Sequence, residues 1–438
     1  MSRILLITST LPWPLRRNGG GQRTELLRRA LRRHGEVDVL AVGGMQLLDG
    51  DVTDPMLADN GITGCFVRSG PPAHDPPPWY AKGPLVGLHE LLEGWRDRFR
   101  PEPAAVEWLG RRMQSPDQRY DLIVGRYLAA ALQGGIATDA VRSVPKLLDY
   151  DDMEWQTLAL ALEHEPWPGI KGRIGASLVL RELRNRSAAA LHDFQHVWVT
   201  SGEDEELLPL DAPSHSVLPN IPYTESSRDT DAPPVRDDAA DVLFVGDLQL
   251  PPNRDGLERF ISEAWPVIRR AVPNAWLRIV GRGLSGEQKE RWSQVPGVDV
   301  IGFAPDLSQC YADAALCIVP TFFGGGTKIK VLEALLNNRP VVTTRHALRG
   351  YDKLNVQGPA VWVGEEMPGL IEGCIKLLTD PATRSAMAER GRAAVLQDFS
   401  WDRFQFTVDQ AVAPLLNAGG RSEGSTLNPP AAPVAVPA

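Results

Sequence analysis

The stretch PTFFGGGTKIKVLEALLNNRPVVTT, residues 320–344, decides the fold of the second half of the chain. It begins at the end of the apolar run ALCIVP, passes through three consecutive glycines and continues with the apolar spacing of a helix. Glycines let the backbone approach a ligand closely, and Thr327 is placed to cap the helix. The first-turn amides and the positive end of the helix dipole then attract an anion. The sequence therefore predicts a strand, a glycine loop and a helix that together bind a negatively charged group.

A diphosphate fits this predicted anion site. Lys330 is expected to supply the main positive charge and Lys328 to add to it. Glu333 is expected on the second helical turn, where its carboxylate can accept hydrogen bonds from ribose hydroxyls. The alternative is an ordinary glycine-rich turn with solvated lysines. The residues predicted to bind the diphosphate are Gly324, Gly325, Gly326, Thr327, Lys328 and Lys330.

Short runs of Val, Ile and Leu recur along the chain with helical stretches between them. Runs that are apolar at nearly every position indicate strands covered on both faces, and alternation with helices indicates doubly wound parallel sheets. The predicted strands are 4–8, 37–42, 121–125, 146–150, 196–201 and 215–220, then 241–246, 275–281, 298–303, 315–320, 340–344 and 360–364. We interpret the two series as two Rossmann-like domains.

The domain boundaries follow from the two strand series. We expect an N-terminal domain at 1–222, a polar linker at 223–240, a C-terminal domain at 241–399, a helix at about 400–417 that packs back on the first domain, and a disordered tail at 419–438. The proline-rich segment 68–104 is interpreted as a surface excursion with one packed helix, or else as an acceptor-binding lip.

Composition excludes several classes of protein. The 438 residues are 43% hydrophobic and 23% charged, which is typical of a soluble globular chain, and the net charge of −9 argues against a general nucleic-acid binder. No apolar run approaches the length of about 18 residues that spans a bilayer, and the first residues do not follow the plan of a signal peptide. The four widely spread cysteines disfavour a zinc site and a disulfide framework. We therefore expect a cytoplasmic protein.

The stretch KLLDYDDMEWQ, residues 146–156, places acidic side chains after a predicted strand. Open α/β sheets bind ligands at this carboxyl edge. Asp151 is predicted to lie near a reacting centre, where it hydrogen-bonds hydroxyls or acts as a base. Two alternatives stay open: the cluster caps the next helix, or it holds a divalent metal. We predict no metal site.

The N-terminal loop repeats the pattern of a strand, glycines and a helix. The helix is predicted to start near Gln22 or Thr24. Either its arginines form a solvated basic face, or they bind an anionic acceptor or a membrane surface. These arginines are Arg23, Arg28, Arg29, Arg32 and Arg33.

Several stretches together resemble glycosyltransferase family 4, retaining enzymes of the GT-B fold among the glycosyl transferases group 1. Residues 320–344 are similar to the nucleotide-sugar-binding segment of the family, residues 244–270 to the opening of its C-terminal domain, and residues 297–320 to its base-binding loop and next strand. The resemblance implies two Rossmann-like doubly wound domains that face each other across a cleft. The C-terminal domain would hold the donor, and the N-terminal domain would be the acceptor side.

The resemblance also assigns site residues. It implies donor contacts from Gly246, Arg254, Gly302, Phe303 and Glu333, and acceptor-side contacts from Gly20, Gly21 and Arg23.

The chain departs from the family at two points. The family carries two glutamates separated by seven residues; Glu333 matches the second, but Gly325 stands in the place of the first, so loop amides must replace that carboxylate. Of the Arg and Lys pair that binds the phosphates in the family, only Arg254 has a counterpart, which moves the phosphate charge to Lys328 and Lys330. Asp151 takes the place of a family histidine.

We therefore expect a retaining glycosyltransferase of the hexosyltransferase type. Its donor would be UDP-, GDP- or dTDP-linked, and its acceptor a hydroxyl of a glycan, a lipid-linked glycan or a small molecule, in polysaccharide, glycolipid or glycosylated-metabolite biosynthesis. Asp151 and Lys330 are the expected catalytic residues, with no cofactor, no metal and no nucleic acid. Peripheral contact with the inner membrane face stays open.

Two alternatives are kept. One is a non-catalytic GT-B-like nucleotide-binding or scaffold subunit, which the loss of the first glutamate favours. The other is a nucleotide-sugar epimerase, which would need no acceptor.

Overall fold

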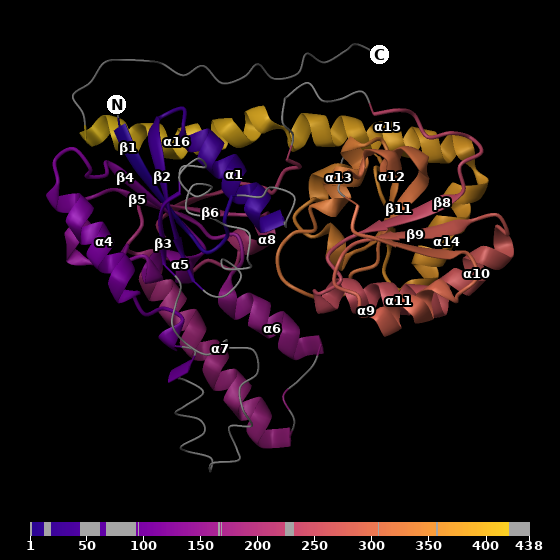
Figure 1. The fold of residues 1–438 in the computed structure, drawn as a ribbon, viewed down its shortest axis with the longest axis horizontal. Helices are drawn as coiled ribbons and strands as arrows, with labels where there is room; N and C mark the ends of the chain where they lie inside the picture. Colours follow the sequence, from indigo (N-terminus) through magenta and orange to yellow (C-terminus); the bar gives the residue numbers. More distant parts are fainter. Residues whose placement is uncertain are drawn as a thin grey trace.

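Two parallel β-sheets flanked by helices form the core of the molecule (Figure 1). The computed structural model describes residues 2–12, 19–43, 62–66, 93–94, 96–164, 167, 169–223, 232–304, 306–355 and 358–419. Within these residues the first sheet has seven strands in the order β3-β2-β1-β4-β5-β6-β7, and the second has six in the order β10-β9-β8-β11-β12-β13. All of these described strands pair in parallel. The predicted fold class of two doubly wound parallel sheets is confirmed.

The strands of the first sheet are short and buried. They are β1 (Ser2–Thr8), β2 (Gly35–Val42), β3 (Ile62–Phe66), β4 (Leu122–Arg126), β5 (Lys146–Asp149), β6 (His196–Val199) and β7 (Ser214–Val217). The helices of this part are α1 (Gly19–Leu31), α4 (Pro103–Gln114), α5 (Leu128–Gln133), α6 (Glu154–His164), α7 (Gly169–Leu191) and α8 (Gly202–Glu205).

The second sheet and its helices follow the same plan. Its strands are β8 (Asp241–Val245), β9 (Trp276–Val280), β10 (Val298–Gly302), β11 (Ala314–Val319), β12 (Val341–Thr344) and β13 (Trp362–Gly364). Its helices are α9 (Pro251–Arg259), α10 (Trp265–Ala271), α11 (Gly286–Ser293), α12 (Ser308–Asp313), α13 (Lys330–Leu336), α14 (Met367–Thr379) and α15 (Pro381–Asp398), and α16 (Trp401–Gly419) follows.

Strand β1 shows why continuous apolar runs form the centre of these sheets. Ile4 and Leu6 belong to one buried cluster, whereas Leu5 and Ile7 belong to another. Because successive side chains of a strand point to opposite faces, β1 is covered on both sides and every position must be apolar.

Twelve of the strands lie where the apolar runs predict them, within one or two residues at most ends. Strand β3 is an addition that the sequence did not predict. Two helices begin elsewhere than expected: α1 starts at Gly19, ahead of Gln22, and α13 starts at Lys330, three residues after Thr327. Helix α1 begins within a run of glycines and α13 follows one, so the backbone there is free to enter the helix at several positions.

Helices α15 and α16 run along one side of the molecule and connect the two sheets (Figure 1). Helix α16 packs on α1, where Asp409 lies 2.6 Å from His34 Nε2 and Gln405 donates to the carbonyl of Ala30 at 3.2 Å. Arg29 of α1 also stacks over the ring of Trp401. The last helix of the chain therefore contacts the first helix of the chain, although α15 before it packs on α13.

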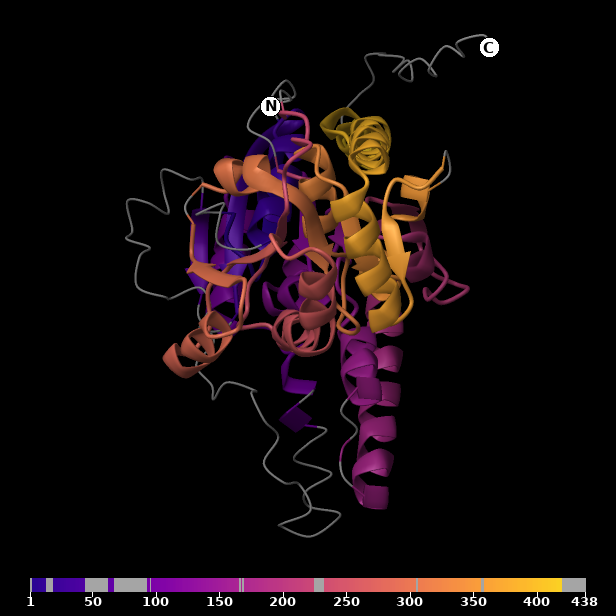
Figure 2. The same ribbon diagram turned by 90° about the vertical axis from the view of Figure 1, so that its right-hand side faces the viewer.

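Helices α6 and α7 pack on each other and project away from both sheets (Figures 1 and 2). No helix in the described residues is both long and apolar enough to cross a bilayer. The predicted tail lies outside the described residues from 420 onward, as do residues 224–231 of the linker and 67–92 of the proline-rich segment.

Candidate functional site

The glycine loop after β11 turns its carbonyl groups toward two basic side chains. Lys328 Nζ donates to the carbonyls of Gly325 at 2.6 Å and Gly326 at 2.8 Å, and His346 Nε2 lies 2.8 Å from the carbonyl of Gly324. Gly324 and Gly326 have φ values of 102° and 65°, which L side chains rarely adopt. Backbone conformation thus favours glycine at 324 and 326, whereas space requires it at Gly325, where a Cβ would come within 2.6 Å of the Thr157 hydroxyl.

The amide groups of the same loop are left without protein partners. Within the described part of the chain, the backbone N–H groups of residues 324–328 donate to no carbonyl or side-chain oxygen. Successive free amides in such a turn form a concave site for an anion. The loop therefore keeps free the amides that the predicted anion site needs, although helix α13 begins only at Lys330, and anion binding there stays a prediction.

Two of the predicted diphosphate contacts serve the loop itself. The ammonium of Lys328 donates its hydrogen bonds to loop carbonyls, and burial lowers the pKa of this lysine to about 8. Thr327 does not cap the helix, because its hydroxyl accepts a hydrogen bond from Asn220 at 2.8 Å and the N-cap position belongs to Ile329. Both residues shape the loop. The predicted helix cap by Thr327 is wrong, whereas the diphosphate contacts predicted for Thr327 and Lys328 stay predictions.

Lys330 lies in the first turn of α13, where its ammonium reaches the carboxyl end of β8. Its Nζ donates to Asn253 Oδ1 at 2.5 Å and lies 5.0 Å from the ring centre of Phe244. A Cβ at Gly246 would come within 3.2 Å of this Nζ, so the glycine makes room for the lysine. Burial lowers the pKa of Lys330 to about 7. The lysine is thus held at the site in a readily titrated form.

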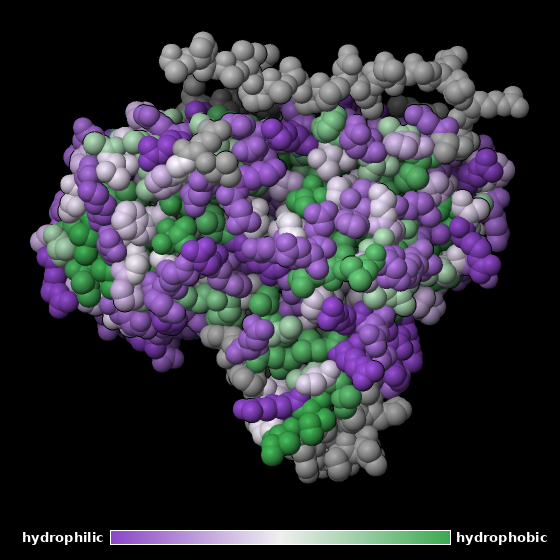
Figure 3. All heavy atoms as spheres, turned by 180° about the vertical axis from the view of Figure 1, so that it is seen from behind, coloured by the Kyte–Doolittle hydropathy of each residue, from purple (hydrophilic) through white to green (hydrophobic). Residues whose placement is uncertain are grey.

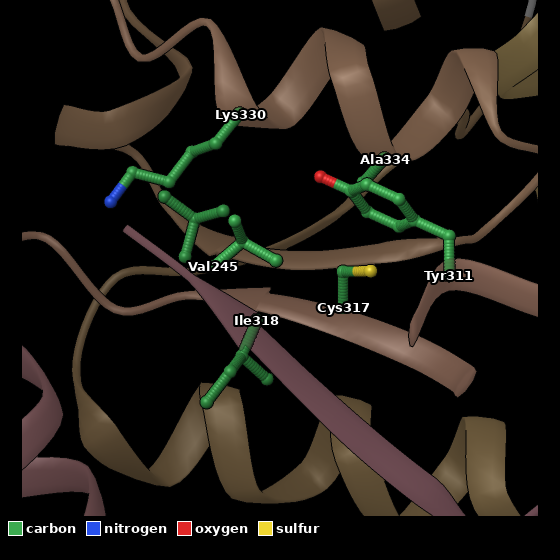
Figure 4. A pocket seen from close by; sticks show the side chains of 7 residues that line it. Val245, Tyr311, Cys317, Ile318, Lys330 and Ala334 are labelled. Atoms are coloured by element: carbon green, nitrogen blue, oxygen red, sulfur yellow. The ribbon is translucent and has the colours of Figure 1, made fainter. Parts of the chain in front are cut away.

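A small pocket runs beside Lys330, between α13 and β11 (Figure 4). Its lining is mainly apolar: Val245, Tyr311, Cys317, Ile318, Val319, Lys330 and Ala334. Burial raises the pKa of the Cys317 thiol to about 12, so this cysteine behaves as an apolar wall. The pocket continues the space around the lysine into the core of the second sheet.

Glu333 faces helix α1 across the gap between the two sheets. Burial raises its pKa, while Lys330 and a hydrogen bond from Gln22 lower it. A Cβ at Gly19 would lie 3.5 Å from Ile329, so the start of α1 packs directly on this turn. Glu333 lies in the first turn of α13, one turn earlier than predicted.

The loops after β8, β9 and β10 meet at the same edge of the second sheet. Gly281 donates its amide to the carbonyl of Gly302 at 2.9 Å, and Arg282 pairs with Asp247 at 3.1 Å. Gly302 has a φ of 81°, and the ring of Phe303 after it is 64% exposed. This edge therefore offers an exposed aromatic face close to the glycine turns.

The guanidinium of Arg254 does not lie beside Lys330. Its guanidinium lies 3.5 Å from the carboxylate of its neighbour Asp255, while Asn253 contacts Lys330. Helix α9 thus turns Asn253 toward Lys330, and the phosphate contact expected of Arg254 stays a prediction.

The acidic residues after β5 form a buried network with two arginines. Arg23 pairs with Asp149 at 2.6 Å, and Arg126 pairs with Asp151 at 2.9 Å. Asn220 donates to Asp151 at 3.1 Å and also to Thr327. Arg23 is only 2% exposed, so it does not face an acceptor, which corrects its predicted acceptor-side role. The network instead connects the first sheet to the glycine loop.

Asp152 lies against the glycine loop from the opposite sheet. A Cβ at Gly326 would come within 2.6 Å of an Asp152 carboxylate oxygen, and one at Gly325 within 2.6 Å of the Thr157 hydroxyl. Burial and the charge of Asp151 raise the pKa of Asp152 to about 7. The loop therefore faces the gap between the sheets, and protein side chains cover its glycines.

The arginines of α1 do not form a single surface patch. Arg23 and Arg28 are buried, and Arg28 pairs with Glu25 at 2.6 Å. Arg29 stacks on Trp401, which leaves Arg32 and Arg33 exposed at the end of the helix. The interpretation of this helix as a continuous basic surface is wrong, because most of its charge is used inside the protein. The glycines before it, Gly20 and Gly21, lie in the first turn of α1.

Among the described residues, no group of three or more His, Cys, Asp or Glu side chains is arranged to hold a metal ion. The acidic cluster after β5 is neutralised by Arg23 and Arg126. That the activity needs no metal ion stays a prediction.

Four further residues at the site were not predicted from the sequence: Gln22, Thr157, Asn220 and Asn253. Asn253 had a signal, because it stands in the stretch PPNRDG directly after a predicted strand. The other three come to the site from the first sheet and have no local pattern of their own.

Comparisons with known proteins agree with this geometry. Residues 239–380 match the family model described as glycosyl transferases group 1. An uncharacterized 44.6 kDa protein in the cps region of Klebsiella pneumoniae is 34% identical over 110 residues, which are 24% of this chain and 28% of that protein. The chain thus matches less than a third of the length of this curated relative.

Solved structures with the same fold cover nearly the whole chain. Sucrose-phosphate synthase from Thermosynechococcus elongatus has a TM-score of 0.62 and 16% identity over 95% of this chain and 100% of its own. HepE from Anabaena, solved with UDP and glucose, has a TM-score of 0.61 and 16% identity over 94% and 100%. A glycosyltransferase from Rickettsia africae has a TM-score of 0.60 and 12% identity over 96% and 99%. At these identities the likeness shows the fold alone, and that fold is GT-B.

Proposed function

Residues 239–380 match the family model of the glycosyl transferases group 1, and on that basis we propose that the chain is a retaining glycosyltransferase. It would move a sugar from a nucleotide-sugar donor to a hydroxyl of a glycan, a lipid-linked glycan or a small molecule. We propose UDP as the nucleotide of the donor, because HepE from Anabaena was solved with UDP. The reaction needs no further cofactor in this proposal.

The free amides of residues 324–328 carry this proposal. They lie just before the start of α13, in the loop whose carbonyls contact Lys328 and His346. A diphosphate would accept hydrogen bonds from them while Lys330 neutralises its charge. Phe303 would stack on the base, and Glu333 would accept hydrogen bonds from the ribose hydroxyls.

The chemical role of the site is electrostatic. The diphosphate gains negative charge as the bond to the sugar breaks, and prepositioned amides together with Lys330 stabilise that charge. The amides also replace the missing first glutamate at Gly325.

The two aspartates after β5, Asp151 and Asp152, have different roles in this proposal. Asp151 is bonded to Arg126 and Asn220, so it positions Thr327 and the glycine loop instead of exchanging protons. Asp152 is free of these bonds and has a pKa of about 7, which suits a group that takes up a proton near neutral pH. We therefore place Asp152 nearer the acceptor hydroxyl than Asp151.

A panel of nucleotides and nucleotide sugars tests the donor site first. We expect UDP to raise the thermal midpoint more than GDP or dTDP, since a ligand at 100 times its Kd stabilises by about 2.7 kcal/mol. Incubation of a bound UDP-sugar with a panel of hydroxyl acceptors should release UDP and give a product with the donor's anomeric configuration, read by NMR. No midpoint shift with any nucleotide would contradict the proposal.

A non-catalytic binding subunit is the second candidate, because Asp152 and Thr157 cover the glycine loop. This candidate predicts nucleotide binding without release of UDP from a nucleotide sugar, with or without acceptor. An epimerase would convert the nucleotide sugar itself with no acceptor present. Release of UDP therefore identifies the transferase, and NMR of the recovered nucleotide sugar separates the epimerase from the binding subunit.

A further inference from the structure

The hairpin of α6 and α7 extends well beyond the two sheets (Figures 1 and 2). Helix α7 has 23 residues, and only part of its length is held by the core, through residues such as Val179, Leu183 and Leu191. Its first half lies outside the body of the protein. None of the chemistry proposed above uses this projecting half.

The projecting half carries an exposed apolar stripe. Ile170 is 80% exposed, Ile174 is 55% exposed and Leu178 is 37% exposed. Their spacing of four residues places them on one face of α7 over about 12 Å. Figure 3 shows the resulting apolar surface on the projecting part of the molecule. Three large aliphatic side chains in one row differ from the scattered apolar residues that are normal on a surface.

Basic side chains stand beside this stripe. Arg173, Arg181 and Arg184 are exposed on the same helix. Along its whole length α7 carries five basic residues, Lys171, Arg173, Arg181, Arg184 and Arg186, against the single acidic residue Glu182. The chain as a whole has a net charge of −9, so helix α7 differs in sign from the chain as a whole. Trp167, at the turn before α7, is partly exposed as well.

We propose that the projecting end of the α6–α7 hairpin docks on the surface of an anionic lipid bilayer. The row of Ile170, Ile174 and Leu178 would enter the boundary between headgroups and acyl chains, and the arginines would remain at the phosphates. Trp167 would lie in the same layer, where tryptophan is enriched. A stripe one residue wide suits shallow insertion, whereas a stable protein interface needs about 1,000 Å² or more.

Docking in this way would hold the two sheets above the bilayer at a distance set by the projecting half of the hairpin. Helix α6 begins just after Asp152, and its Thr157 lies on Gly325, so the base of the hairpin contacts the glycine loop. The proposal goes beyond the sugar-transfer reaction and does not depend on it.

Binding to vesicles tests the docking surface. The full chain would be sedimented with vesicles of phosphatidylcholine alone and with vesicles of equal parts phosphatidylcholine and phosphatidylglycerol. We expect binding to the anionic vesicles only. Ile170→Glu/Ile174→Glu should weaken it about tenfold or more, because the apolar face is lost. Arg173→Glu/Arg181→Glu should weaken it to a similar degree, because each basic residue contributes at an anionic surface.

A matched control is Leu210→Glu, since Leu210 is fully exposed outside the hairpin. It should bind the anionic vesicles like the wild type, and unchanged circular dichroism should confirm that all variants fold. Three results would overturn the proposal: no binding to anionic vesicles, equal loss in the Leu210 variant, or a wild-type dimer that the isoleucine variant abolishes. The last result would assign the stripe to a second copy of the chain. The vesicle assay contains no donor, so its result can be interpreted even if the proposed sugar-transfer reaction fails.

Discussion

The ammonium of Lys330 is the residue-scale feature on which donor binding depends. Burial lowers its pKa to about 7, so above neutral pH the free protein holds much of this lysine uncharged. A bound diphosphate would favour the charged form and raise that pKa. Binding above pH 7 must then take up a proton, and the affinity for UDP should fall by up to about tenfold per pH unit. Calorimetry at pH 8 in buffers of different ionisation enthalpy measures this uptake.

Asp152 provides the control for this titration, because its pKa is also raised to about 7 and a nearby anion would raise it further. In Lys330→Met we expect weaker binding at pH 7 and a loss of most of the proton uptake. In Asp152→Asn most of the uptake should remain. If the uptake instead follows Asp152, the assignment of the phosphate charge to Lys330 is wrong.

The buried arginines show where inference from sequence ends at this scale. In the sequence, Arg23 is flanked by residues that are typical of an exposed helix face, and this pattern predicts a solvated side chain. Its actual partner, Asp149, lies 126 positions further along the chain. No local pattern encodes that pairing, because it arises only when α1 and β5 are placed side by side by the fold.

At the scale of elements, the glycine loop must keep its backbone shape for its amides to converge. Gly326 has a φ of 65°, and a Cβ there would also come within 2.6 Å of Asp152. We expect Gly326→Ala to lose about 1–2 kcal/mol of stability from the left-handed backbone, and to bind UDP at least tenfold more weakly because the loop must shift. Urea unfolding and calorimetry measure the two effects.

Gly358→Ala separates backbone strain from the site. Gly358 has a φ of 105° and nothing within 4 Å of its ideal Cβ. Its substitution should therefore cost stability without changing the affinity for UDP. Equal loss of affinity in both variants would mean that the glycine loop has no special part in binding.

Most strands and helices could be predicted from the sequence. The apolar run 315–320 and the three glycines after it placed β11 and the loop correctly, because buried parallel strands and positive φ angles leave strong local signals. The start of α13 was less readable. Lys328 folds back on the loop carbonyls, and this contact delays the helix to Lys330 and brings Glu333 into its first turn.

At the scale of the whole molecule, contacts between the two sheets hold the gap closed. Asn220 connects the first sheet to Thr327, and Arg349 of the second part pairs with Glu203 at 2.5 Å and Asp204 at 2.6 Å. With Asp152 and Thr157 lying on the glycine loop, a donor cannot reach the amides unless these contacts open. Opening of the gap is therefore expected to precede donor binding.

The Arg349 contacts test this expectation, because they join the two halves of the molecule through Glu203 and Asp204. Losing about 1 kcal/mol of the closing energy should raise the open population about fivefold, and the association rate of UDP in Arg349→Ala should rise to a similar extent. Stopped-flow fluorescence measures that rate. Arg345→Ala is the control, since Arg345 pairs with Glu365 within the second part at an exposed position, and pairs of that kind contribute little. An association rate in Arg349→Ala that equals the wild-type rate would mean that the gap opens freely, and that Arg349 contributes to stability alone.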